Sequence, residues 1–233
     1  MTRRLRLALL FLALLLPAAA RAQVVALDTT EGAARFHRAA SGPQALRLLS
    51  DLETEMYLTF CGPASLATAL NSLGVHDPSP PSFYPYRRLT QTALFTPANL
   101  AVKSFASVQA QGLTLRQLAA FAHNLGAAAQ AVHADALDAA ALRARIIDVL
   151  ADPASRLIAN YSRIPLGQEG DGHISPIAAY DAASDSALIL DVARYKYTPA
   201  WVPVATLLAA MQRTDPDSGR PRGLLVLTVR RPQ

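Results

Sequence analysis

Hydrophobic residues recur along the chain with two different periods, and the helical period dominates its first part. Leu66 and Leu70 follow Cys61 at helical spacing, and Gly74 is a typical helix end. This pattern predicts a helix that begins at Cys61 or Gly62. Further predicted helices cover residues 43–49, 113–126, 137–152 and 206–215.

Apolar runs that are typical of strands appear mainly in the second half of the chain. Predicted strands cover residues 128–134, 156–162 and 223–229. The segments "HISPIAAYD" and "ALILDVARY" flank the polar turn "AASDS", which predicts an antiparallel hairpin. The proline-rich residues 76–99 are expected to form a loop. Because helices come first and strands later, the predicted fold class is α+β with an antiparallel sheet.

The first 22 residues have the pattern of a secretory signal peptide. Three early arginines precede an apolar run from Leu7 to Leu16, and an Ala-Arg-Ala sequence ends at Ala22. We expect cleavage before Gln23, export to the bacterial periplasm, and a single domain over residues 23–233. An uncleaved membrane anchor is the alternative, although the apolar run is shorter than the roughly 20 residues that span a bilayer.

Net charge argues against a nucleic-acid partner once the leader is set aside. The leader holds four of the 22 basic residues and no acids, which leaves 18 basic and 17 acidic residues, a formal charge of +1. No run of basic residues remains to bind phosphates.

Cys61 is the only cysteine of this sequence, which excludes an internal disulfide and a cysteine-rich zinc site. At a helix N-terminus, we expect the pKa of its thiol to be lowered, which favours the nucleophilic thiolate. Gly62 is expected to let a substrate carbonyl approach the backbone N–H groups. A buried cysteine without any chemistry explains the same position equally well.

Among five histidines, His173 is the best placed to act as a base, because it opens a predicted strand directly after "GQEGDG". Depending on the centre of the hairpin turn, His173 lies opposite Asp191 or Tyr195. Opposed residues have Cβ atoms about 5 Å apart, which allows an imidazole–carboxylate contact. A salt bridge that only secures the hairpin is the alternative. Together, Cys61, His173 and Asp191 have the chain order of papain-like cysteine enzymes.

Four blocks of the sequence resemble the catalytic domain of phytochelatin synthases, and above all the short prokaryotic members that hydrolyse glutathione. The blocks are "YLTFCGPASLATALNSLG", "GQEGDGHISPIAAYD", "ALILDVARYKYTPAWVP" and "TDPDSGRPRG". The resemblance runs from about Leu52 to the C-terminus. It implies a papain-like fold, in which the nucleophile helix packs on an antiparallel sheet.

The resemblance also implies a reaction. Cys61 would attack the Cys–Gly peptide carbonyl of glutathione, with His173 as base and then acid and with Asp191 holding the imidazole. The γ-Glu-Cys acyl-enzyme would pass to water, giving γ-glutamylcysteine, or to a second glutathione, giving phytochelatin for heavy metal detoxification. Because the sequence ends without the cysteine-rich extension of the plant-type enzymes, hydrolysis is favoured over polymer synthesis.

Substrate contacts and partners follow from the same resemblance. Arg163, Asp215 and Arg222 would surround the γ-glutamyl group, whose carboxylate suits an arginine fork and whose ammonium suits an acid. With one thiol, no resident metal or other cofactor is expected, although cadmium or zinc glutathione thiolates could act as substrate or activator. A homodimer is left open.

Glu55 departs from the family pattern, which has a glutamine six residues before the cysteine as an oxyanion donor. Loss of one such donor typically costs about a hundredfold to a thousandfold in rate. Glu55 could be protonated, Thr54 or Thr59 could replace it as donor, or the enzyme could be weak. Two other functions therefore stay open: a periplasmic cysteine peptidase on other γ-glutamyl or short peptides, and a catalytically weakened glutathione-binding protein.

Overall fold

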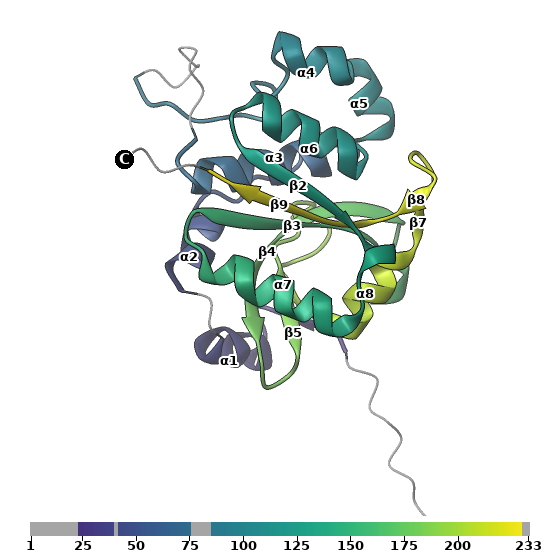
Figure 1. Ribbon diagram of the computed structural model, residues 1–233. Helices are drawn as coiled ribbons and strands as arrows, with labels where there is room; N and C mark the ends of the chain where they lie inside the picture. The colour runs from purple at the N-terminus through teal and green to yellow at the C-terminus, as the bar shows by residue number, and fades with distance from the viewer. Residues whose placement is uncertain (1–22, 40–41, 76–84, 230–233) are drawn as a thin grey trace, which may run out of the picture.

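A seven-stranded antiparallel sheet forms the centre of the molecule in the computed structural model, which describes residues 23–39, 42–75 and 85–229 (Figure 1). The predicted leader and residues 76–84 of the predicted loop lie outside these ranges. The strand order is β1 (Val25–Ala26), β6 (Ala200–Pro203), β5 (Ser186–Ile189), β4 (Gly172–Asp181), β3 (Ser155–Ser162), β9 (Gly223–Thr228) and β2 (Ala128–His133). A separate two-stranded ribbon pairs β7 (Thr214–Asp215) with β8 (Arg220–Pro221).

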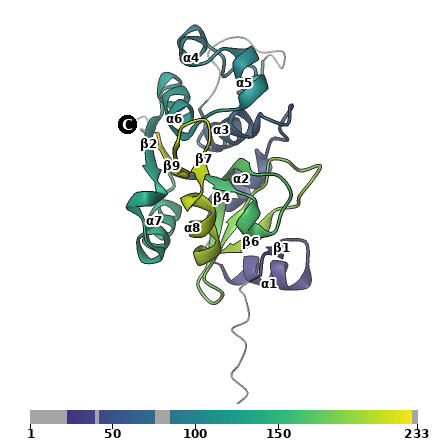
Figure 2. The ribbon, with the colours of Figure 1, turned by 90° about the vertical axis from the view of Figure 1, so that its right-hand side faces the viewer.

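Helices cover both faces of the central sheet. They are α1 (Thr30–Arg38), α2 (Gly42–Ser50), α3 (Cys61–Ser72), α4 (Pro97–Val102), α5 (Phe105–Gln111), α6 (Leu115–Asn124), α7 (Ala139–Ala151) and α8 (Val204–Gln212), with short 3-10 helices η1 (Ala134–Ala136) and η2 (Ile164–Leu166). In Figures 1 and 2, α4, α5 and α6 gather at one end of the molecule, away from α1.

Apolar side chains form one core layer on each face of the sheet, and the alternation of side chains along β3 contributes to both layers. Ile158 points to the layer of α3 and α6, whereas its neighbour Leu157 points to the layer of α7 and α8. Because β3 has hydrogen-bonded neighbours on both sides and a helix layer on each face, all eight of its residues are buried. The predicted α+β class with an antiparallel sheet is therefore confirmed.

The nucleophile helix α3 lies in the core, and all twelve of its residues are buried. It packs on β4, where Ser65 Oγ donates a hydrogen bond to the carbonyl of Ile174 over 2.9 Å. This contact ties the N-terminal half of α3 to the first residues of β4. The helix end that carries Cys61 is thereby held beside the strand end that carries His173.

The structure confirms most of the predicted elements, with bounds that shift by one or two residues. They are helices α2, α3, α6 and α7 and strands β2, β3 and β9. Helix α8 covers 204–212 and not 206–215, so that residues 214–215 form β7 instead. Helix α4 begins at Pro97, inside the predicted loop, because Thr96 caps it. Helices α1 and α5 and strand β6 were not predicted. The two-residue strands were not predicted either, because two residues carry no periodic signal.

The β4–β5 hairpin is confirmed, but neither of its two expected registers is correct. Tyr180 pairs with Ala187, a bulge follows, and β5 already ends at Ile189. His173 therefore has no partner in β5 and pairs instead with Tyr161 of β3. In the part of the chain described above, no helix is both long enough and apolar enough to cross a membrane.

Candidate active site

Cys61 is the first residue of α3, and its side chain is buried. The backbone N–H groups at this end of the helix favour a negative charge. Burial nevertheless raises the pKa of the thiol to about 12, the charge of Glu55 adds to the rise where that carboxyl is ionised, and backbone groups of Ile174 and Gly62 oppose it. The expected lowering of the thiol pKa is therefore wrong: the resting thiol keeps its proton and needs a base.

Gly62 does not lie where the sequence analysis expected it. A Cβ at this position would meet side-chain atoms of Leu113 at 3.4 Å and of Ile174 at 3.6 Å, and Gly62 is not among the residues that line the cavity. A Cβ there would make ordinary van der Waals contacts, so Gly62 faces packed side chains of Leu113 and Ile174. Direct access of a substrate carbonyl past Gly62 is not supported by this placement.

His173 and Asp191 are in contact, as the sequence analysis predicted. Nε2 of His173 lies 2.9 Å from Oδ1 of Asp191, and both side chains are buried. The oxygen is not in line with the ring N–H, so the two groups interact mainly through charge once the imidazole is protonated. Burial lowers the pKa of His173 more than Asp191 raises it. The resting imidazole is therefore neutral at pH 7 and can accept a proton.

Arg163 contacts Asp191 and not the cavity. Its Nη1 and Nη2 donate to the two carboxylate oxygens of Asp191 over 2.7 Å and 3.0 Å, and the ring of Tyr197 lies 4.8 Å from its guanidinium carbon. Burial opposes ionisation of Asp191, but His173 and Arg163 outweigh it and hold the pKa of the carboxyl below its usual range. The structure does not bring Arg163 to the proposed γ-glutamyl site; it places Arg163 behind the imidazole–carboxylate pair.

Glu55 lies beside Cys61 and His173, with a carboxylate oxygen, Sγ and an imidazole nitrogen all within 4.8 Å of one another. Its side chain is buried and does not line the cavity. Oε1 accepts a hydrogen bond of 2.5 Å from the hydroxyl of Tyr195, whereas Oε2 has no partner among the described residues. Burial raises the pKa of Glu55, Tyr195 opposes this rise, and Asp191 adds to it.

The backbone around Glu55 is held from both sides by Gln91. The side-chain amide of Gln91 donates to the carbonyl of Thr54 over 2.8 Å and accepts from the N–H of Met56 over 3.0 Å. The hydroxyl of Thr59 donates to the carbonyl of Gln109 over 2.8 Å. Thr59 is therefore already engaged and is a poor substitute for the missing oxyanion donor.

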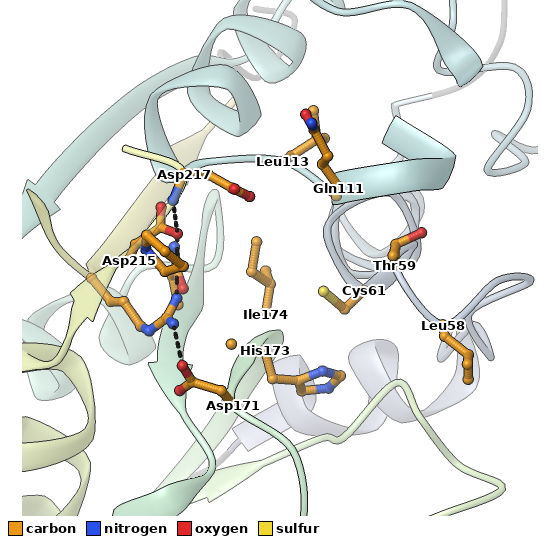
Figure 3. A pocket seen from close by; sticks show the side chains of 15 residues that line it. Leu58, Thr59, Cys61, Gln111, Leu113, Asp171, His173, Ile174, Asp215 and Asp217 are labelled. Atoms are coloured by element: carbon orange, nitrogen blue, oxygen red, sulfur yellow. Dashed lines mark hydrogen bonds and ion pairs between the residues drawn. The ribbon is translucent and has the colours of Figure 1, made fainter. Parts of the chain in front are cut away.

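A cavity of about 240 Å³ opens beside Cys61 (Figure 3). In Figure 3, Cys61 and His173 lie on one side of it, and Asp171 and Asp215 lie on the other. The lining residues are Leu58, Thr59, Cys61, Gln111, Gly112, Leu113, Asn160, Asp171, Gly172, His173, Ile174, Asp215, Pro216, Asp217 and Arg222. The nucleophile thus shares one cavity with a group of charged side chains.

The charged side of the cavity is built around Arg222, which directly precedes β9. Its guanidinium lies 3.3 Å from Asp171 and 3.7 Å from Asp215, and its buried Nε has no partner among the described residues. Gly172 gives it space, since a Cβ there would lie 2.9 Å from Nη1. Arg222 and Asp215 were predicted from the sequence, whereas Asp171 and Asp217 were not. The position of Asp171 in "GQEGDGH", two residues before His173, was the available signal.

One group of three potential metal-ligating side chains exists in the described ranges, and it consists of Glu55, Cys61 and His173. We assign no metal to them, because an ion there would occupy the thiol that the site presents. The expectation of no resident metal stays a prediction.

The fold and the site define a class: papain-like α+β proteins, with a cysteine at the start of a core helix and a strand histidine that contacts an aspartate just beyond the next strand. The phytochelatin synthase family model matches residues 16–224. Glutathione gamma-glutamylcysteinyltransferase 1 of Triticum aestivum is 38% identical over 183 residues, which cover 78% of this chain and 35% of that protein. Glutathione gamma-glutamylcysteinyltransferase 2 of Arabidopsis thaliana is 35% identical over 181 residues, with 78% and 39% covered.

A yeast relative extends the same comparison. The glutathione gamma-glutamylcysteinyltransferase of Schizosaccharomyces pombe is 29% identical over 208 residues, which cover 88% of this chain and 49% of that protein. This chain belongs to the phytochelatin synthase family. It spans between about a third and a half of the length of these curated relatives.

Proposed function

We propose that this protein transfers the γ-glutamylcysteinyl group of glutathione through a thioester on Cys61 and releases glycine. The observation that carries the proposal is the placement of Cys61 and His173 in one cavity with Arg222 and Asp215. The names of the curated relatives support glutathione as the substrate. With one buried thiol and no separate metal-ligating group among the described residues, we propose that the protein itself needs no metal cofactor.

The geometry supports a stepwise acyl transfer. His173 takes the proton of the Cys61 thiol as the sulfur attacks the Cys–Gly carbonyl, and Asp191 stabilises the imidazolium that forms. When the tetrahedral intermediate collapses, His173 returns the proton to the departing glycine amine, and a thioester remains. Water or the α-amino group of a second glutathione then attacks the thioester, and His173 accepts a proton from the attacking group. The C–S bond breaks, and His173 returns the proton to the departing Cys61 sulfur.

The charged side of the cavity suits a γ-glutamyl end. The Arg222 guanidinium can donate two parallel hydrogen bonds to the free α-carboxylate. Asp171, Asp215 and Asp217 offer carboxylates to the free α-ammonium. Since an ordinary peptide presents no such pair of charges at this distance from its scissile bond, the cavity favours glutathione over a general peptide.

The proposal is tested by incubating the protein with glutathione and analysing the products by mass spectrometry. We expect glycine together with γ-glutamylcysteine or phytochelatin, and a γ-glutamylcysteinyl adduct on Cys61. Cys61→Ala should abolish both product and adduct, a loss on the order of 10⁶-fold, as for removal of the nucleophile of a covalent hydrolase. Absence of product with the unmodified protein, or equal rates with Cys61→Ala, would contradict the proposal.

Arg222→Met is expected to raise the KM for glutathione with a much smaller change in kcat. A charge-assisted hydrogen bond is worth about 1.5–3 kcal/mol, which corresponds to roughly a 10- to 150-fold loss of binding. Steady-state kinetics measure the split between KM and kcat, and the unfolding midpoint reports on folding. Arg220→Met is the matched control, because Arg220 is half exposed and does not line the cavity. A fall in kcat alone would argue against a binding role for Arg222.

Export is a further part of the proposal. The arginine-rich start, apolar run and Ala-Arg-Ala sequence of the first 22 residues support a leader that directs the protein to the bacterial periplasm. N-terminal sequencing of protein recovered from periplasmic extracts tests this, with Gln23 as the expected first residue.

A further inference from the structure

Glu55 carries the one buried carboxylate oxygen without a partner in the described part of the chain. The side chain is 6% exposed, and Oε2 is removed from solvent. An ionised carboxylate oxygen in such a place lacks both water and a donor, which is costly. A protonated oxygen instead carries an O–H group that can donate to an acceptor that arrives later.

The two oxygens of Glu55 have different surroundings, and these fix which one holds the proton. Oε1 accepts from the hydroxyl of Tyr195, so it is the carbonyl oxygen of a neutral acid. Oε2 is then the hydroxyl oxygen. Gln91 holds the backbone on both sides of Glu55, at Thr54 and Met56, and Tyr195 holds its side chain through Oε1.

The reacting sulfur lies next to this group. A carboxylate oxygen of Glu55 and Sγ of Cys61 are within 4.8 Å of each other, so an oxygen on the carbon that Cys61 attacks would lie close to both. Hydrogen-bond donors of an oxyanion hole lie about 3 Å from the developing oxyanion. The backbone N–H of Cys61 at the start of α3 is the natural second donor, because the first N–H groups of a helix have no partner within the helix.

We propose that Glu55 acts as a neutral carboxylic acid whose Oε2–H donates a hydrogen bond to the oxyanion formed when Cys61 attacks. This inference rests on the proposed function and adds a catalytic residue to it. No proton is lost by Glu55 during the reaction. The Sγ–C bond forms, the carbonyl electron pair moves to oxygen, the thiol proton goes to His173, and Oε2–H stabilises the oxyanion until glycine leaves.

The surroundings of Glu55 favour the neutral form. Burial raises its pKa most, Tyr195 opposes this through its hydrogen bond, Asp191 raises the pKa, and Arg163 and Lys196 lower it. The titratable or charged groups that face Glu55 are Cys61 on α3, His173 on β4, Arg163 after β3, and Asp191, Tyr195 and Lys196 after β5. As pH rises through the pKa of Glu55, the donor becomes a charge that repels the oxyanion, so activity must fall.

Glu55→Gln is the decisive variant, since an amide donates at every pH. At low pH, we expect wild type and Glu55→Gln to have comparable kcat/KM. At a pH where Glu55 is ionised, kcat/KM of the variant should exceed that of wild type by about a hundredfold or more, which is the usual rate contribution of one oxyanion donor. Ionisations of glutathione itself affect both proteins equally and cancel in the ratio of their rates. Glu53→Gln is the matched control, because Glu53 lies on the same segment but pairs with Arg88, and its pH profile should match wild type.

Two other variants separate donation from a structural role. Glu55→Ala should lose about a hundredfold to a thousandfold at low pH, where wild type is active. Tyr195→Phe removes the donor that favours the ionised carboxylate, so the alkaline loss of activity should shift to higher pH. Infrared difference spectra should contain the carbonyl band of a protonated carboxylic acid that disappears with rising pH and is absent from Glu55→Gln.

The outcomes distinguish this inference from the proposed function. If the unmodified protein releases no glycine at any pH, the proposed function fails. If it releases glycine but shares its entire pH profile with Glu55→Gln, or if the infrared band is absent, the proposed function stands and the role of Glu55 is refuted. A Glu55→Gln variant that is faster at all pH values would show that Glu55 is ionised throughout, which also refutes it.

Discussion

Asp191→Asn is expected to lower the rate of glycine release by about 10⁴-fold, the loss typical of replacing the orienting aspartate of a catalytic triad. Oδ1 of Asp191 lies 2.9 Å from Nε2 of His173, and its charge stabilises the imidazolium that forms as Cys61 attacks. A neutral amide removes that charge and can also hold the imidazole in the wrong tautomer. Single-turnover measurement of glycine release separates this step from product release.

Asp181→Asn is the control for the structural part of that effect. Asp181 is a buried carboxylate at the other end of β4, where it binds Arg38 through both oxygens. Its replacement should weaken the fold and leave the rate of glycine release per folded molecule unchanged. If Asp191→Asn stays within tenfold of the wild-type rate, Asp191 is only part of a salt bridge near the hairpin.

Arg163→Met should destabilise the protein by about 3–5 kcal/mol, the usual cost of removing one partner of a buried ion pair. Both side chains of the Arg163–Asp191 pair are about 95% buried, and two hydrogen bonds of 2.7 Å and 3.0 Å join them. Methionine fills most of the volume but leaves the Asp191 carboxylate without its main compensating charge. Urea denaturation, with the free energy of unfolding extrapolated to water, measures the loss.

Arg143→Met provides the comparison at an exposed site. Arg143 binds Asp185 through two hydrogen bonds of 2.8 Å and 2.6 Å, a bidentate contact like that between Arg163 and Asp191. Both Arg143 and Asp185 are solvent-exposed, however. Because water screens the exposed pair, this variant should change the free energy of unfolding far less than Arg163→Met does. Equal losses for the two variants would show that burial of the Arg163–Asp191 pair is unimportant.

The position of Arg163 could be predicted only in part from the sequence. The resemblance placed it near the substrate, but the structure places it behind Asp191, outside the cavity. An arginine after the central strand β3 can reach either side of the sheet end. The side on which the Arg163 side chain lies depends on the path of the segment after β5. Neither hydrophobic periodicity nor turn signals predict that path.

The His173–Asp191 contact was predicted correctly from a register that is wrong. The bulge in β4 and the early end of β5 remove any pairing of His173 within the hairpin. Asp191 instead lies in the segment beyond β5, where the N–H of Ala193 donates to its Oδ1 over 2.9 Å. Asp191 was still predicted correctly as the partner of His173, because a single charged residue in an apolar run needs a partner in any strand register.

The sequence by itself determined the chemistry that is available and the local elements that carry it. The single thiol, the start of its helix, the strand that opens at His173 and the order of helices and strands all depend on residues close together in the chain. Only the tertiary structure decided that burial raises the thiol pKa, that Arg163 binds Asp191, and that Oε2 of Glu55 is enclosed without a partner among the described residues. These properties arise where segments far apart in sequence exclude water from one another, and solvent exclusion is set by packing and not by local pattern.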